Sequence, residues 1–254
     1  MRKVIRQIVF AYYRTLYKRR KPFDFLLLVS HMRAGSSLLT HILSSNPDIF
    51  GYGETHTKYS DEAKPVDLIC KVAMLKGIVF SFGNEKFVLD KVLHNELLNV
   101  QNIEIFRNLN CKIVFLLRDP EDSIRSMITT LNYSEEHAIN YYLRRIKHLT
   151  NLHKALCDQY DTTVVTYDSL LSDTDSFLMR LTNFLNLSVP LSPKYQLHKT
   201  TGKKGIGDPG PNIFSGEVKT TSHPPHPNAK LSTSSSKKLY AAYDELLGRT
   251  VDSD

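Results

Sequence analysis

The chain alternates short, continuous apolar runs with longer segments in which apolar residues recur every three or four positions. A continuous run is typical of a strand buried on both faces, whereas the longer spacing is typical of an amphipathic helix. The runs predict four strands, over residues 23–30, 86–90, 112–117 and 162–167. The longer segments predict a short helix between Ser36 and Asn46 and further helices over residues 66–75, 120–131, 135–158, 174–186 and 236–248. This alternation predicts an α/β fold, with one mainly parallel central sheet flanked by helices.

The first 21 residues differ from the rest of the chain in charge. They hold eight basic side chains and no acidic one, whereas residues 22–254 hold 25 basic and 26 acidic side chains. A nearly neutral main segment argues against nucleic acid as a partner. Apolar residues recur at helical spacing among the basic ones. This basic amphipathic segment either rests on an anionic lipid surface, as a peripheral membrane contact, or packs on the domain with its charges in solvent.

A second unusual segment, residues 188–235, contains seven of the eleven prolines and five of the eleven glycines. Its composition predicts a long loop within the main domain, residues 22–254.

The three cysteines are odd in number and widely spaced, which argues against a disulfide framework and against a zinc site, and we predict no metal site. The sequence shows neither a secretory signal nor an apolar run long enough to span a membrane. We therefore expect a cytoplasmic protein, with the inner membrane face as the alternative.

The turn after the first predicted strand, residues 31–37, has the composition of an anion-binding site. Gly35 allows a close approach of the backbone, Ser36 and Ser37 supply hydroxyl groups, and Arg33 supplies positive charge. The free N–H groups at the start of the next helix would point toward a bound phosphate. The turn is not a Walker A loop, because no lysine precedes the serines. Taken alone, it is equally compatible with an ordinary strand-to-helix turn that carries a surface arginine.

A second candidate anion site follows the predicted strand at residues 112–117. Arg118 comes directly after this strand, at the position where open α/β sheets bind ligands. Pro120 suits the first turn of the next helix, which places Ser126 roughly two turns into it. The alternative is that Arg118 pairs with Asp119 across the turn and that Ser126 is a surface residue of the helix.

Four segments, taken in order, resemble the motifs of sulfotransferases that use 3′-phosphoadenosine 5′-phosphosulfate (PAPS). FLLLVSHMRAGSSLLTHIL resembles the 5′-phosphosulfate loop of this family, and IVFLLRDPEDSIRSM resembles its 3′-phosphate motif. VVTYDSLLSD is similar to a family strand that ends in tyrosine and an acidic residue, and GKKGIGDPGPNIFSGEV is similar to the basic loop that closes over the nucleotide. The resemblance covers roughly residues 23–217 and implies a fold like that of P-loop nucleotide-binding enzymes.

The resemblance also implies roles for individual residues. The 5′-phosphosulfate would be held by Arg33, Ala34, Gly35, Ser36, Ser37 and Leu38. Arg118 and Ser126 would bind the 3′-phosphate, with help from Lys204 and Gly205. Tyr167 would lie against the adenine, although a core tyrosine at the end of a strand is an equally good interpretation. Two anion sites on separate βα units suit a nucleotide that carries phosphates at both its 3′ and 5′ positions.

Three residues are candidates for the base that removes the acceptor's proton. Glu54, in a glycine-flanked loop, resembles the base of carbohydrate-type and bacterial sulfotransferases, and we prefer it to His56 and His94. Lys91 resembles the lysine that faces the transferring group and would stabilise charge on the departing phosphate oxygen. Small-molecule sulfotransferases carry a histidine two positions after this lysine, where this chain has Leu93. The alternative for Glu54 is a loop glutamate that merely pairs with a lysine.

The predicted function is therefore transfer of a sulfuryl group from PAPS to a hydroxyl or amine of an acceptor. The carbohydrate-type pattern and the basic first segment favour a glycan or glycolipid, and a small hydroxylated metabolite is the alternative. A nucleotide kinase on a related fold would need a Walker lysine and carboxylates for magnesium. A non-catalytic nucleotide-binding adaptor would not need both Lys91 and Glu54. The sequence does not indicate the oligomeric state.

Overall fold

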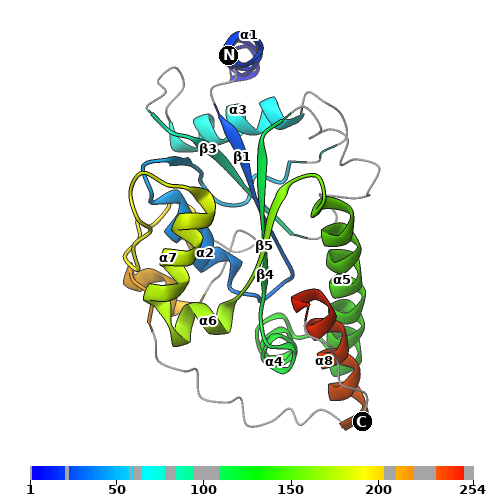
Figure 1. Cartoon of the computed structure of the whole chain (residues 1–254). Helices are drawn as coiled ribbons and strands as arrows, with labels where there is room; N and C mark the ends of the chain where they lie inside the picture. Colours follow the sequence, from blue (N-terminus) through cyan, green and yellow to red (C-terminus); the bar gives the residue numbers. More distant parts are fainter. Residues whose placement is uncertain are drawn as a thin grey trace.

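A computed structural model of the chain describes residues 2–20, 23–57, 59, 64–77, 84–93, 109–202, 210–219 and 233–248. Its centre is a five-stranded parallel sheet in the order β2-β3-β1-β4-β5. The strands are β1 (Asp24–Ser30), β2 (Ile49–Phe50), β3 (Phe87–Val92), β4 (Cys111–Leu117) and β5 (Asp161–Thr166). Figure 1 shows helices on both faces of the sheet. The α/β fold expected from the sequence is therefore confirmed.

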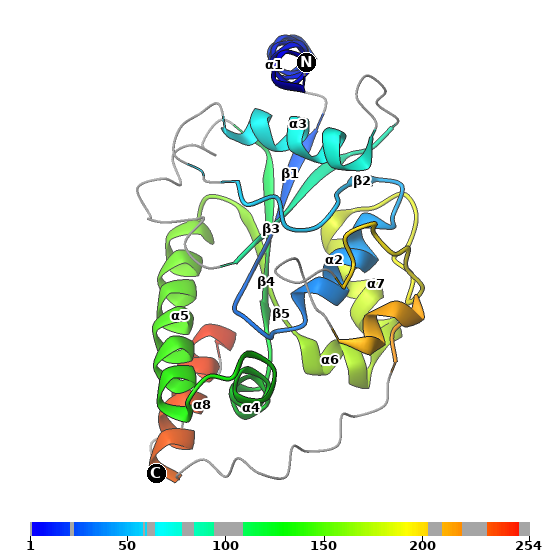
Figure 2. The same cartoon turned by 180° about the vertical axis from the view of Figure 1, so that it is seen from behind.

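The two faces of the sheet are covered by different helices (Figures 1 and 2). On one face lie α3 (Lys64–Lys76), α4 (Pro120–Leu131), α5 (Glu135–Leu156) and α8 (Thr233–Leu247). On the other lie α2 (Ser36–Ser44), α6 (Tyr167–Ser172) and α7 (Thr174–Leu185). Alternate residues of β1 enter the two cores, with Phe25 and Leu27 on one side and Leu26 and Leu28 on the other. All four side chains are buried, as expected for a central parallel strand.

The structure differs from the sequence prediction at β2, at β3, which extends beyond Asp90 to Val92, and at α6, a helix that was not predicted. Strand β2 was not predicted, because two residues are too few to show a periodic pattern. The strand predicted over residues 162–167 ends one residue early, since Tyr167 is the first residue of α6. The Thr166 hydroxyl accepts a hydrogen bond from the N–H of Ser169, and this cap starts the helix at the end of the strand.

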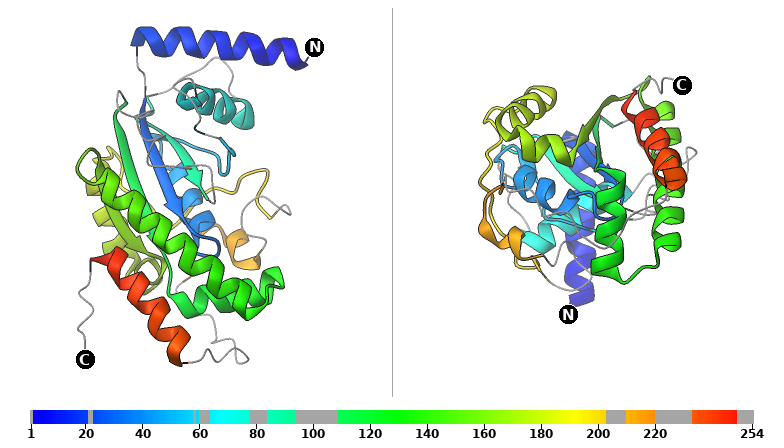
Figure 3. Two further views of the ribbon diagram at one scale, coloured as in Figure 1. Left: turned by 90° about the vertical axis from the view of Figure 1, so that its right-hand side faces the viewer. Right: turned by 90° about the horizontal axis from the view of Figure 1, so that it is seen from below.

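Helix α1 (Arg2–Arg20) lies at the amino ends of the strands and packs on α3 (Figure 3). Its Val9 and Tyr13 belong to the core, and the Arg14 guanidinium pairs with Asp67 of α3 at 3.0 Å. The predicted loop at 188–235 is described in part. It contains an antiparallel bridge between Lys194 and Glu217 and the 3₁₀ helix η2 (Pro211–Ser215).

Candidate active site

The turn between β1 and α2 has the backbone that an anion-binding loop requires. Arg33 and Gly35 both have positive φ, of 64° and 80°. A Cβ atom at Gly35 would come within 2.1 Å of the Tyr167 ring, so only glycine fits there. Gly35 is the N-cap of α2 and places no side chain on the first N–H groups of the helix. These donors and the helix dipole favour an anion at this point.

The residues of this turn that were predicted to bind the 5′-phosphosulfate differ in what their side chains can offer a ligand. Ala34 is fully buried in the core and Leu38 packs against the same core, so each can offer a ligand only its backbone. The Ser37 hydroxyl, in contrast, accepts a hydrogen bond from Lys91 Nζ at 3.2 Å. Ser37 therefore connects the turn to the end of β3.

The two predicted anion sites meet in space. Arg33 Nε donates a hydrogen bond to Ser126 Oγ on α4 at 2.9 Å. Arg118 Nη1 donates to the carbonyl oxygen of Arg33 at 3.3 Å. The guanidinium of Arg33, which we had grouped with the 5′-phosphosulfate, therefore lies beside the residues expected to bind the 3′-phosphate.

Arg118 is held in place but keeps one donor for a ligand. Its Nη2 lies 3.4 Å from Asp122 Oδ2, so its carboxylate partner is Asp122 of the next helical turn, whereas Asp119 caps α4. Its guanidinium also lies over the Tyr167 ring, 5.0 Å from the centroid. Among the residues that the structure describes, no acceptor contacts its buried Nε. A phosphate oxygen would satisfy this donor, and the site therefore fits an anionic group.

The buried His31 side chain forms hydrogen bonds to the backbone of both turns. Its Nε2 accepts a hydrogen bond from the N–H of Arg118 at 3.3 Å, so Nδ1 carries the proton and donates to the carbonyl of Met32 at 2.9 Å. Burial lowers the pKa of His31 to about 3, and the nearby charges of Arg145 and Arg118 act in the same direction. His31 is thus neutral at physiological pH and fixes the backbone of both turns.

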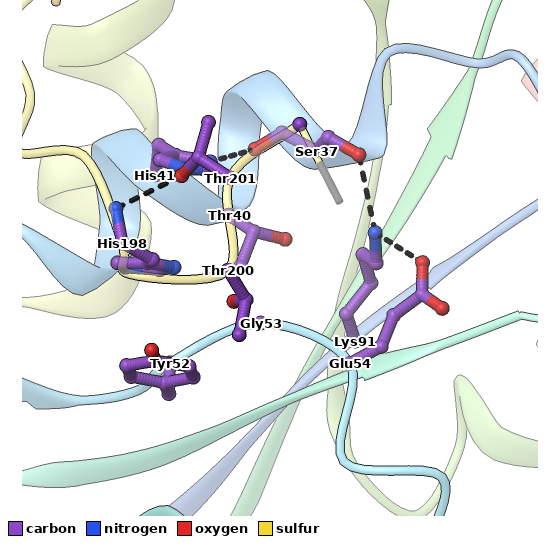
Figure 4. Close-up of a pocket in the computed structure, with 11 residues that line it drawn as sticks. Ser37, Thr40, His41, Tyr52, Gly53, Glu54, Lys91, His198, Thr200 and Thr201 are labelled. Carbon is purple, nitrogen blue, oxygen red and sulfur yellow. Dashed lines mark hydrogen bonds and ion pairs between the residues drawn. The ribbon is translucent and has the colours of Figure 1, made fainter. Parts of the chain in front are cut away.

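The predicted catalytic groups lie together at the end of β3. Lys91 Nζ is 2.6 Å from Glu54 Oε1, and the two side chains are only 2% and 12% exposed. Figure 4 shows this pair beside Ser37. A carboxylate and an ammonium group therefore adjoin the turn predicted to hold the 5′-phosphosulfate. His56, the second candidate base, has its Nε2 3.6 Å from Glu54 Oε2 and a side chain that is 62% exposed. His94, Lys204 and Gly205 lie outside the described residues.

The loop that carries Glu54 is fixed by buried polar groups. Asp90, next to Lys91 in β3, accepts hydrogen bonds from Thr55 Oγ1 at 2.8 Å and Tyr59 OH at 2.6 Å. Lys71 of α3 donates to the carbonyl oxygens of Thr55 and His56 and to the hydroxyl of Thr57. Consecutive strand residues project to opposite faces of a sheet. At the end of β3, Lys91 therefore forms an ion pair with Glu54, and Asp90 fixes the loop that carries Glu54 through hydrogen bonds.

A pocket opens next to Glu54 and Lys91, and the sequence analysis did not predict its far wall. Tyr52, His198 and His41 form a stack, with centroid distances of 4.7 Å and 4.4 Å. His41 Nε2 accepts a hydrogen bond from the Thr201 hydroxyl at 2.8 Å (Figure 4). Ser44 Oγ is 2.9 Å from His198 Nε2. Burial lowers the pKa of His41 below its ordinary value of 6.5 and lowers the pKa of His198 to about 3. Both rings are therefore neutral at pH 7. No local motif links α2 to residues 198–201, which is why this wall was missed.

Tyr167 lies between the two anion turns, in contact with Gly35 and under Arg118. This position adjoins both predicted phosphate sites. Within the described part of the chain, no cluster of three or more histidine, cysteine or acidic residues has the arrangement of a metal site.

The two turns lie at the carboxyl ends of β1 and β4, where open α/β sheets bind ligands. The model of the sulfotransferase domain family matches residues 23–201, which is more than half of the chain. The chain therefore belongs to the sulfotransferase family, a class of transferases.

Two solved structures resemble this fold. The sulfotransferase domain from the curacin biosynthetic pathway superposes with a TM-score of 0.58 at 18% sequence identity, covering 90% of this chain and 98% of that domain. The sulfotransferase domain of the Synechococcus PCC 7002 olefin synthase gives a TM-score of 0.57 at 16% identity, covering 86% of this chain and 94% of that domain. No curated protein sequence matches the chain. At these identities the two structures bear on the fold alone.

Proposed function

We propose that this protein transfers a sulfuryl group from PAPS to a hydroxyl group of a polar acceptor. The observation that carries the proposal is the buried Lys91–Glu54 pair, joined through Ser37 to the anion turn after β1. This arrangement supplies a base and a cation within hydrogen-bond reach of one donor site.

In the proposed reaction Glu54 accepts the proton of the acceptor hydroxyl as its oxygen attacks sulfur. The sulfur–oxygen bond to the phosphate breaks, and Lys91 Nζ stabilises the negative charge on the departing oxygen. The N–H groups at the start of α2 bind the 5′-phosphate that remains. The products are the sulfated acceptor and 3′-phosphoadenosine 5′-phosphate.

The 3′-phosphate is assigned to the junction of the two turns, where Arg33, Arg118 and Ser126 meet. The buried Nε of Arg118, which has no acceptor among the described residues, supports this assignment. We place the adenosine beside Tyr167, between the two phosphate sites. His94, Lys204 and Gly205 stay predictions from the sequence.

The pocket wall indicates the class of acceptor. Its described lining residues beyond Glu54 and Lys91 carry mainly hydroxyl and imidazole groups, and none of them is aliphatic; they are Ser37, Thr40, His41, Tyr52, Gly53, His198, Thr200, Thr201 and Gly202. The hydroxyl and imidazole groups of this lining can form hydrogen bonds with a polyhydroxylated molecule. We therefore propose a glycan, or the sugar of a glycolipid, as the acceptor.

Titration calorimetry tests the donor assignment. The full chain is titrated with 3′-phosphoadenosine 5′-phosphate in the presence of a chelator and, separately, with ATP plus magnesium. We expect metal-independent binding of the bisphosphate and much weaker binding of ATP. Preference for magnesium-ATP would contradict the proposal and favour a phosphoryl transferase. Incubation with labelled PAPS and a panel of sugars and phenols then tests the acceptor class.

A further inference from the structure

Helix α1 buries only part of its apolar surface. Val9 and Tyr13 are each 1% exposed in the contact with the domain. Val4, Ile8 and Tyr12 are 57%, 56% and 38% exposed. These three residues are spaced by four, so they form a stripe along one side of the helix, beside the buried residues. The apolar arc of α1 is therefore wider than packing on the domain requires.

The charge of this segment indicates what the stripe contacts. Residues 1–21 carry eight basic and no acidic side chains, and the remaining residues carry 25 basic and 26 acidic ones. A second copy of α1 would bring like charges together, and three side chains are too few for a stable protein interface. An anionic lipid surface attracts the basic residues and accepts the apolar stripe, as in helices that lie in the plane of a membrane interface.

The position of α1 permits this contact. Figure 3 shows the helix at the outer end of the molecule, beyond α3. None of the helices in the described ranges has the length and apolar character needed to cross a bilayer. We propose that α1 lies flat on an anionic membrane surface, with the stripe of Val4, Ile8 and Tyr12 inserted among the lipid headgroups.

Sedimentation of the full-length protein with vesicles tests this proposal. Phosphatidylcholine vesicles are compared with vesicles that also contain phosphatidylglycerol. We expect binding to the anionic vesicles that weakens with added salt, and little binding to the neutral ones. The double variant Val4→Ser/Ile8→Ser removes apolar surface without changing charge, and it should lower the affinity for anionic vesicles at least about tenfold. The matched control is Met179→Ser on α7, a site that is 64% exposed, and it should bind as the wild type does.

Three outcomes would overturn the proposal: no preference of the wild type for anionic vesicles, wild-type binding by the double variant, or an equal loss in Met179→Ser. A shift from dimer to monomer in the double variant, without lipid binding by the wild type, would assign the stripe to a second copy instead. Binding of 3′-phosphoadenosine 5′-phosphate is measured on the same samples. Because Val4 and Ile8 lie outside the candidate site, this binding should stay unchanged, so the result is independent of the proposed enzymatic function.

Discussion

The two ends of the candidate active site are built in different ways. The proposed donor end consists of Arg33, Arg118 and Ser126, which lie in the turns and the helix that directly follow β1 and β4. The proposed acceptor end consists of Glu54, Lys91 and the segment of residues 198–202. These three parts are distant from one another in the sequence and line one pocket. The donor end thus follows from the regular geometry of βα units, whereas the acceptor end depends on how separate loops pack. We expect variants at the two ends to separate nucleotide affinity from turnover.

The largest effect is expected at the acceptor end, for Glu54→Gln. Loss of the base should lower turnover at least about 100-fold, while affinity for 3′-phosphoadenosine 5′-phosphate changes little. Turnover is measured with labelled PAPS and affinity by calorimetry. Glu245→Gln is the control, because Glu245 also pairs with a lysine, Lys154 at 2.8 Å, but on the surface. Full turnover in Glu54→Gln would move the base to His56 or His94.

The donor end should respond in the opposite way to Arg118→Ala. This change removes charge-assisted hydrogen bonds to the 3′-phosphate and should weaken nucleotide binding by about 1.5–3 kcal/mol. Calorimetry measures the loss. Arg125→Ala, on the same helix as Ser126, removes an arginine that pairs with Glu121 and should bind the nucleotide normally. Equal losses in the two variants, or none in Arg118→Ala, would reject the assignment of the 3′-phosphate.

His31, behind the donor end, should make stability depend on pH. Its folded-state pKa of about 3 lies below the ordinary value of 6.5, so between these values the unfolded chain binds the proton more readily. The free energy of unfolding should therefore fall as the pH drops through this window, and His31 alone contributes about 2 kcal/mol between pH 7 and pH 5. Denaturant unfolding of wild type and His31→Gln at both pH values measures the difference. Identical pH dependence in the two proteins would show that His31 is not buried in its neutral form.

A smaller effect on turnover is expected from Asp90→Asn, which weakens the hydrogen bonds that hold the loop carrying Glu54. The amide can accept one of the hydrogen bonds from Thr55 and Tyr59 but carries no charge, and we expect turnover to fall about tenfold. Nucleotide affinity should stay constant, because the hydrogen bonds from Thr55 and Tyr59 connect Asp90 to the loop that carries Glu54. A purely structural role for Asp90 would instead lower thermal stability and leave the turnover of the folded protein unchanged.

Particular residues show how far the sequence alone was informative. The buried runs of β1, β3 and β4 predicted the sheet. The motif after β1 pointed to Ser37 and the family resemblance pointed to Lys91, and the structure brings these two residues together. The sequence could not predict that Arg33 turns toward Ser126, because that contact depends on the orientation of α4 against the turn. It also missed the pairing of His41 with Thr201, which are 160 positions apart and share no periodic pattern.

The hydrogen bond between Arg33 and Ser126 has one more consequence. It joins the turn after β1 to helix α4, and Tyr167 lies against Gly35 of that turn and under Arg118 of the turn after β4. If the two turns bind a nucleotide as proposed, side chains that the protein already holds in place would lose little conformational entropy on binding. On the proposed function, the fixed spacing of the two turns would then favour nucleotides that carry phosphates at both the 3′ and 5′ positions.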